Sequence, residues 1–61
     1  MRPLKAKVLK YEASCLYTVF MWCRGGSIET GNKRTPALAK RAFVAMCNRL
    51  GITKDKYIIE D

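Results

Sequence analysis

The most regular hydrophobic pattern in the chain covers residues 35–50, where apolar side chains recur at steps of four, three and four. Thr35 is a residue type preferred at a helix N-cap, and Pro36 suits the first helical position, where its missing N–H costs nothing. Gly51 supplies the left-handed backbone conformation that commonly ends a helix. The pattern therefore predicts an amphipathic helix over residues 35–50.

The two sides of this predicted helix differ sharply in chemistry. We expect its core face to consist of Ala39, Phe43, Met46 and Leu50, with Ala42 beside them and Cys47 at the edge. The opposite side carries Lys40, Arg41, Asn48 and Arg49. This polar side has three positive charges and no carboxylate, which favours an acidic partner such as nucleic acid.

Residues 16–22 form the run richest in β-favouring side chains and predict the central strand of a sheet. Alternation along this strand gives two apolar faces. One face contains Tyr17, Val19, Met21 and Cys23, and the other contains Leu16, Thr18, Phe20 and Trp22. One helix can cover only one of them, and the pattern does not decide which. The uncovered face is expected to meet another subunit, a macromolecular partner or stacked bases.

The remaining segments predict the other strands. Residues 5–12 are interpreted as an outer strand, with Ala6 and Val8 on one side and Lys5 and Lys7 on the other. The paired glycines within residues 24–27 predict a hairpin turn that leads into a short strand at 28–30. After a polar turn at 53–56, residues 57–59 predict a short edge strand or, alternatively, a helical turn. The expected fold is one α+β domain over residues 1–61, a three-stranded antiparallel meander packed by one helix.

The formal net charge of +7 over 61 residues is the strongest compositional signal. The positive side chains fall into an N-terminal group and a group around the predicted helix start, which consist of Arg2, Lys5, Lys7 and Lys10, and of Lys33, Arg34, Lys40 and Arg41. Nucleic acid is the first expected partner, followed by an acidic protein surface and anionic lipid. Simple solubility is the alternative explanation of the charge.

The cysteines and the apolar runs argue against a disulfide-bonded, a zinc-binding and a membrane-spanning protein. Cys15 and Cys23 would lie about 26 Å apart on one strand, too far for a disulfide. With no signal peptide visible, we expect reduced thiols and a cytoplasmic protein. The chain has no histidine and no CxxC motif, which argues against a zinc site. The longest apolar run, at 15–23, is shorter than the roughly 20 residues of a membrane-spanning helix.

The sequence contains no constellation typical of an enzyme. Without histidine, a cysteine nucleophile lacks its usual activating base, and no pair of carboxylates has a suggestive spacing. The segment from Arg24 to Ser27 lacks the GxxxxGK[ST] spacing of a P-loop. We therefore expect a protein that is not an enzyme and that binds no metal or cofactor.

One stretch resembles a known family. The run Tyr17-Thr18-Val19, followed by Gly25, Gly31, Thr35, Ala39-Lys40 and Ala42, is similar to the C-terminal half of a double-stranded-RNA-binding domain. The resemblance implies that Thr35 caps a helix whose start contacts phosphates, with Lys40 as the last lysine of the family's motif. Pro36 and Ala37 stand where the family has paired lysines, and its first helix has no counterpart. Three strands followed by a helix also resemble the arm domains of tyrosine integrases, which read DNA with the sheet.

Two functional hypotheses follow. The leading one is non-catalytic binding of RNA or DNA, with phosphate contacts from the helix start and the first strand, namely Lys5, Lys7, Lys10, Lys33, Arg34, Lys40 and Arg41. The alternative is a small inhibitor or regulator of the phage type that docks its apolar sheet on a protein. Its anchors would be Phe20 and Trp22, or Tyr17 and Met21 if the sheet faces the other way. A homodimer that hides the same face is a simpler version of this alternative.

Overall fold

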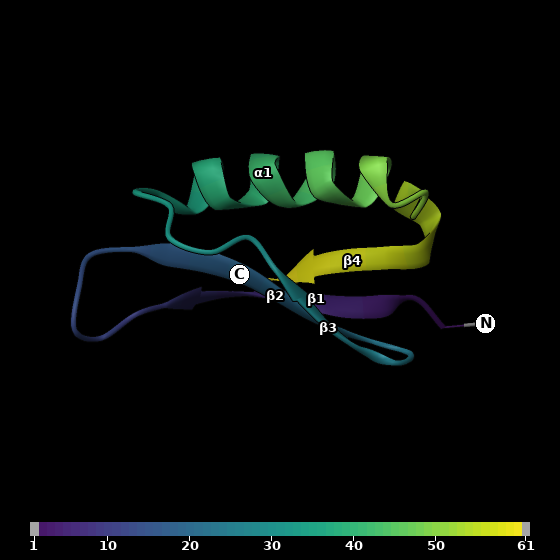
Figure 1. Ribbon diagram of the computed structural model, residues 1–61, viewed down its shortest axis with the longest axis horizontal. Coiled ribbons are helices and arrows are strands. Elements are labelled where there is room, and N and C mark those ends of the chain that lie inside the picture. The colour runs from purple at the N-terminus through teal and green to yellow at the C-terminus, as the bar shows by residue number, and fades with distance from the viewer. Residues whose placement is uncertain (1, 61) are drawn as a thin grey trace.

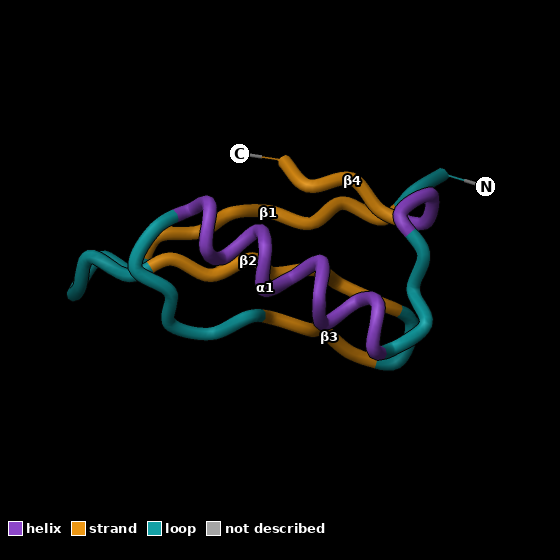
Figure 2. Tube along the Cα trace, turned by 90° about the horizontal axis from the view of Figure 1, so that it is seen from above, coloured by secondary structure: helices purple, strands orange, loops and turns teal. Residues whose placement is uncertain are grey.

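The computed structural model describes residues 2–60; Met1 and Asp61 lie outside the described residues. The elements follow in the order β1 (Leu4–Lys10), β2 (Tyr17–Cys23), β3 (Gly26–Glu29), α1 (Pro36–Arg49), a 3₁₀ turn η1 (Lys54–Lys56) and β4 (Tyr57–Glu60). The strands form one mixed sheet in the order β3-β2-β1-β4, and α1 crosses one face of it (Figures 1 and 2). The predicted α+β architecture, an antiparallel meander with one helix and a C-terminal edge strand, is confirmed.

A tight hairpin joins β2 to β3. Cys23 pairs with Gly26 across the two antiparallel strands, so that Arg24 and Gly25 form the turn between them. Gly25 has a φ of +90°, a conformation that side-chain-bearing residues rarely adopt. The predicted hairpin is confirmed and Gly25 is required by the backbone, although Gly26 and Ser27 already belong to β3 and Thr30 lies outside it.

The position of β1 differs from the prediction. The strand begins at Leu4 and lies inside the sheet, because β4 pairs with it in parallel from Leu4 opposite Tyr57 to Lys7 opposite Glu60. Parallel neighbours need a long crossover, and α1 provides it by carrying the chain from β3 over β2 and β1 to β4. The interpretation of β1 as an outer strand was wrong, whereas the last strand at 57–59 is confirmed and the alternative helical turn is not formed.

Both ends of α1 are held as the sequence predicts. The N–H of Leu38 donates to Thr35 Oγ1 at 3.1 Å, and Pro36 takes the first helical position. At the other end the N–H of Ile52 donates to the carbonyl of Cys47 at 2.9 Å, and Gly51 has a φ of +77°. These two features form a Schellman-type end, which satisfies carbonyls that the last turn leaves without helical partners.

The core face of α1 is rotated relative to the predicted stripe. Its fully buried residues are Ala39, Phe43 and Cys47, which follow a strict spacing of four. They pack against a floor of Ala6, Val19 and Met21, with Tyr57 closing one side. Leu50, the C-cap residue, is 57% exposed, so its assignment to the core was wrong. Met46 and Ala42 are only half-buried.

Phe43 is the largest fully buried side chain, and its ring meets that of Tyr57 edge to face at 5.4 Å. We expect Phe43→Ala to cost about 3–5 kcal/mol, which is comparable to the whole stability of so small a domain. Leu50→Ala removes an exposed apolar side chain from the same helix and should cost less than about 1 kcal/mol. Urea unfolding followed by circular dichroism measures both, and equal costs would contradict the burial described.

The same core holds two groups that ionise at alkaline pH. Burial raises the pKa of the Cys47 thiol above its ordinary 9.0, and burial likewise raises the pKa of the Tyr57 hydroxyl. Both groups therefore stay neutral in the folded protein at a pH where the unfolded chain already loses their protons. Stability linked to the thiol is complete well below its ordinary pKa of 9.0 and is lost as the pH rises toward and through the folded-state value.

We therefore expect the free energy of unfolding to fall between about pH 8 and pH 10.5, with the Cys47 thiol as one cause. In Cys47→Ala this decline should be shallower, although the variant is less stable at neutral pH. Lysine deprotonation occurs in both proteins, so the difference between the two pH profiles reports the Cys47 thiol together with its effect on the Tyr57 hydroxyl. Parallel profiles would show that Cys47 does not contribute.

Candidate nucleic-acid interface

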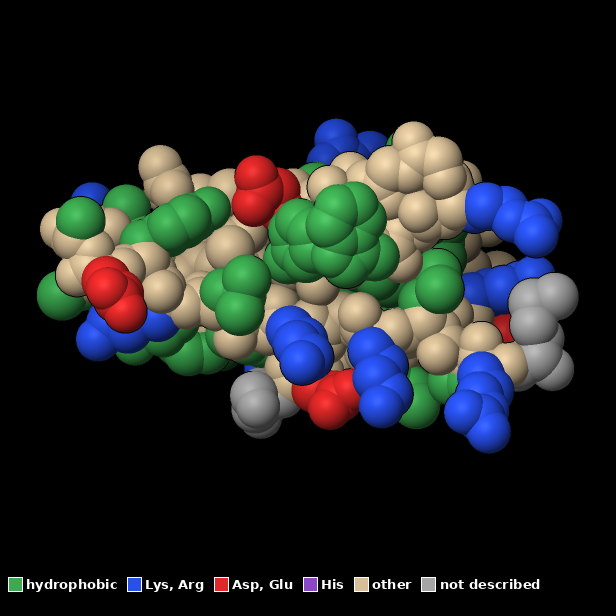
Figure 3. Space-filling view, turned by 90° about the horizontal axis from the view of Figure 1, so that it is seen from below, with side chains coloured by type: hydrophobic (Ala, Val, Ile, Leu, Met, Phe, Trp, Pro, Cys, Tyr) green, Lys and Arg blue, Asp and Glu red, His purple; other side chains and the backbone are tan. Residues whose placement is uncertain are grey.

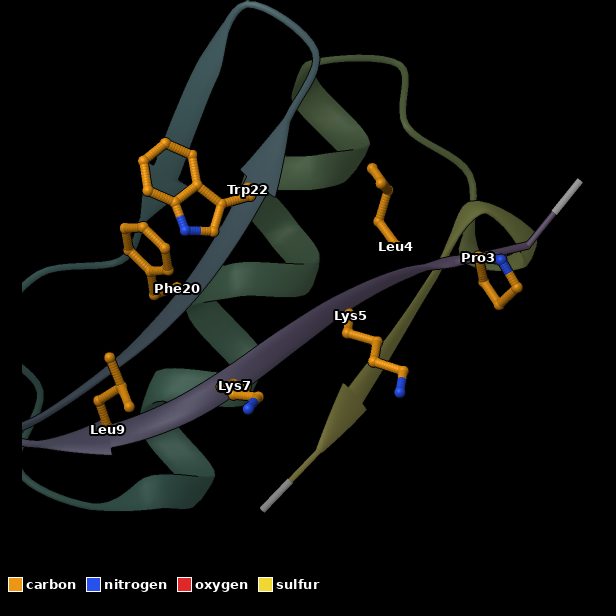
Figure 4. A pocket seen from close by; sticks show the side chains of 7 residues that line it. All are labelled: Pro3, Leu4, Lys5, Lys7, Leu9, Phe20 and Trp22. Carbon is orange, nitrogen blue, oxygen red and sulfur yellow. The ribbon is translucent and has the colours of Figure 1, made fainter.

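One face of the sheet is left uncovered by α1, and we call it the open face. It presents Phe20 and Trp22 from β2, together with Lys5, Lys7 and Leu9 from β1 (Figure 4). Hydrophobic side chains gather at its centre, and Lys and Arg side chains lie along one border (Figure 3). The structure thus decides the question that the two apolar sides of β2 left open.

Successive residues of β2 show this division clearly. Met21 is 0% exposed beneath the helix, whereas its neighbour Trp22 is 70% exposed. Tyr17 lies on the covered side with Met21 and is half-buried. The predicted protein contact through Met21 is wrong because its side chain has no accessible surface. Of the proposed anchors on β2, Phe20 and Trp22 are the ones that belong to the open face.

The two aromatic rings on the open face touch. Their centroids lie 5.3 Å apart at an interplanar angle of 84°, an edge-to-face pair. Phe20 is half-buried and Trp22 extends further into solvent. Leu9 and Ile58 are exposed as well and enlarge the apolar surface. Neither residue is among the predicted site residues; Ile58 reaches this face because β4 pairs it with Lys5, which the sequence pattern does not reveal.

The charged side chains on the two sides of the aromatic pair differ in sign. On β1, Lys7 lies directly opposite Phe20, and Lys5 is the next residue on the same side. The Nζ of Lys5 lies 3.9 Å from Glu60 Oε1 on β4. On the other side of Phe20, β3 places Glu29 opposite the ring. Positive charge therefore borders the aromatic pair along β1, and negative charge borders it along β3.

A second basic surface surrounds the start of α1. The segment before the helix is tied to β2, since the N–H of Tyr17 donates to the carbonyl of Lys33 at 2.6 Å and the reverse bond measures 2.8 Å. Lys10 of β1 is the partner of Tyr17 on its other side. Lys10 and Lys33 therefore flank Tyr17 in one row, about 10 Å apart across two strand spacings. Arg34 follows Lys33 directly.

Two threonines reinforce this attachment. The N–H of Val19 donates to Thr30 Oγ1 at 3.0 Å, and the N–H of Gly31 donates to Thr18 Oγ1 at 3.1 Å. Thr18 is buried and Thr30 is half-buried, so these bonds are partly shielded from water. The loop that carries the basic residues to the helix is consequently held along β2 up to Lys33.

We call Lys10, Lys33, Arg34 and Arg41 the helix-start cluster. Lys33 and Arg41 line one shallow hollow together with Leu38, Ala42 and Ala45. Among residues 2–60, no member of the cluster forms an ion pair. Lys40 differs, because it is half-buried and already has a partner within the fold. The cluster therefore presents four charges that the described part of the protein does not neutralise.

The backbone at the start of α1 has fewer free N–H groups to donate to an anion than a typical helix N-terminus. Pro36 has no N–H, and the N–H of Leu38 is used by the Thr35 cap. The N–H of Ala39 donates to the Thr35 carbonyl at 3.1 Å. Ala37 is the remaining donor of the first turn, so phosphate contacts at this end must come mainly from side chains.

The predicted basic residues do not form one continuous surface. Lys5 and Lys7 lie on the open face, whereas the helix-start cluster lies on the side that α1 covers. The basic residues predicted on the first strand are thus divided between two faces: Lys5 and Lys7 lie apart from the helix-start cluster, whereas Lys10 lies within it. The cause is the alternation of β1, which points odd-numbered and even-numbered side chains to opposite faces.

Comparison with protein-family models, with curated proteins and with solved structures finds no match for this chain. Within residues 2–60, no helix combines the length and the apolar character that crossing a membrane requires. The same residues contain no group of three or more His, Cys, Asp or Glu side chains arranged to hold a metal ion. The open face and the helix-start cluster are therefore the two surfaces of the protein that bear on its function.

Proposed function

We propose that the protein binds nucleic acid without catalysing a reaction. The observation that supports this most directly is the helix-start cluster, in which Lys10, Lys33, Arg34 and Arg41 are brought together without an ion pair among the described residues. Concentrated positive charge of this kind attracts a polyanion and releases its counterions on binding.

The individual side chains suit phosphate contacts. Arg34 and Arg41 are exposed, and a guanidinium can donate two parallel hydrogen bonds to one phosphate. Lys10 and Lys33 add point charges at positions fixed by pairing with Tyr17. Contacts of this type position a nucleic acid without reading its bases. The cluster therefore supports binding by charge and shape.

Salt dependence tests the proposal. The logarithm of the association constant for a nucleic acid should fall linearly with the logarithm of salt concentration. The double variant Arg34→Ala/Arg41→Ala removes two phosphate contacts, so the magnitude of the slope should drop by about 1.4–1.8. Fluorescence anisotropy of a labelled oligonucleotide at several salt concentrations gives these slopes.

A matched control separates local contacts from total charge. Lys54→Ala/Lys56→Ala also removes two positive charges, from the 3₁₀ turn beyond the opposite end of α1. Its slope should remain close to that of the unmodified protein. If both double variants change the slope equally, the helix-start cluster is not a binding site; if no nucleic acid binds even at low salt, the proposed function is wrong.

A protein partner is the second candidate, favoured by the exposed apolar side chains of Leu9, Trp22 and Ile58 on the open face. In this case the protein would act as a small inhibitor or regulator, and Trp22 would be its main anchor. Because burial of apolar surface depends weakly on salt, capture of one protein at high salt would distinguish this function from nucleic-acid binding. A homodimer through the same face would appear in sedimentation of the isolated chain.

A further inference from the structure

We infer that the open face binds a single-stranded nucleic acid, with a base stacked on Trp22 and phosphates at Lys5 and Lys7. The inference rests on the proposed function and deepens it by naming the form of nucleic acid and a second contact surface. It is argued from the geometry of the aromatic pair, the position of the lysines and the distribution of acidic residues.

The indole ring of Trp22 offers an exposed surface for stacking. Trp22 is 70% exposed, and its edge-to-face contact with Phe20 at 5.3 Å leaves ring surface free. Stacking on such a ring stabilises an unpaired base, because every base has a π face. Bases inside a duplex are already stacked on their neighbours, and separating them costs a few kcal/mol per step. The exposed ring therefore favours a single strand over a duplex.

The lysines of β1 border the surface on which a base would stack. A shallow hollow lies between β1 and β2, with Phe20 and Trp22 on one side and Lys5, Lys7 and Leu9 on the other (Figure 4). Lys5 and Lys7 lie about 7 Å apart along β1. A base seated on the apolar floor would therefore place the adjoining phosphates of its strand along β1, where Lys5 and Lys7 lie.

The ion pair between Lys5 and Glu60 does not remove this lysine from use. Its separation is 3.9 Å, and the two side chains are 73% and 43% exposed. Glu60 Oε1 is itself shielded from solvent and accepts no hydrogen bond, but an ion pair at this separation with an exposed lysine contributes little. A phosphate can thus compete for Lys5, while Lys7 has no ion pair among residues 2–60.

Acidic and basic side chains lie on opposite sides of Phe20. Glu29 lies opposite Phe20 on the β3 side and repels a phosphate there, whereas Lys7 lies opposite Phe20 on the β1 side. The strand should therefore follow the hollow between β1 and β2 and avoid β3. The uneven charge on the two sides of Phe20 therefore predicts the route that a bound strand takes across the open face.

A second copy of the chain fits this face less well. Two copies joined face to face would bring Lys5 and Lys7 of each toward a protein that also carries a charge of +7. Burying unpaired ammonium groups costs free energy, and like charges add repulsion. A negatively charged ligand removes both penalties, so charge complementarity selects the nucleic acid.

The single tryptophan allows a direct test. Intrinsic fluorescence should be quenched saturably when single-stranded DNA or RNA of about ten nucleotides is added, because the base stacks on the only indole. A duplex of the same length should quench little. In anisotropy measurements with a labelled single strand, Trp22→Ala should weaken binding about ten-fold, whereas Trp22→Phe should retain most of the affinity.

Two further variants sharpen the result. Leu50→Ala removes an exposed apolar side chain away from the open face and should bind like the unmodified protein. Lys7→Glu should weaken binding and lower the salt slope, which tests the face independently of the aromatic ring. Circular dichroism verifies that each variant is folded.

Several results would overturn the inference. Unchanged affinity in Trp22→Ala, or equal quenching by duplex and single strand, would show that bases do not stack on the open face. Salt-dependent binding lost only in Arg34→Ala/Arg41→Ala would keep the proposed function and reject this second surface. A dimer in sedimentation that dissociates in Trp22→Ala would assign the face to a second copy, and salt-resistant capture of one protein abolished by that variant would assign it to a protein partner.

Discussion

The packing of one short helix on a four-stranded sheet controls the rest of this structure. Ala39, Phe43 and Cys47 seal one side of the sheet against Val19 and Met21. A helix of this length has no further surface with which to cover the other side, and in residues 2–60 no other helix crosses the sheet. The exposure of Phe20 and Trp22 is therefore a consequence of the same burial that stabilises the fold.

The crossover through α1 also determines where charge collects. The chain must leave β3, run back along β2 and enter the helix, and the bonds between Tyr17 and Lys33 hold it on this route. Since β1 brings Lys10 to the same row, basic residues from three separate parts of the sequence meet near the helix start. The arrangement comes from backbone pairing, and no ion pair is needed to build it.

Local signals in the sequence predicted the local structure well. Thr35, Pro36 and Gly51 determine the ends of the helix through contacts within a few residues, so its boundaries could be predicted. The interior position of β1 could not be, because it depends on pairing between Leu4 and Tyr57 at opposite ends of the chain.

The sequence indicated which residues belong to the candidate site but not how they are arranged in space. The basic residues and the aromatic pair were identifiable from the sequence, whereas the face covered by the helix was not, since both sides of β2 are apolar. That single tertiary choice buried Met21, exposed Trp22 and separated Lys5 and Lys7 from the helix-start cluster. Leu50 shows the same limit, because its spacing fits the predicted stripe although its side chain lies largely in solvent.

Charge and stability are linked in a protein of this size. A domain of 61 residues buries a small core, and a net charge of +7 adds self-repulsion that opposes compaction. Solubility alone does not require that the helix-start cluster lie without counter-charges in the described part of the fold. A bound polyanion would relieve the repulsion and, by binding the folded state preferentially, would stabilise it by mass action. Under the proposed function, the positive charge that opposes compaction of the isolated chain would be neutralised when nucleic acid binds.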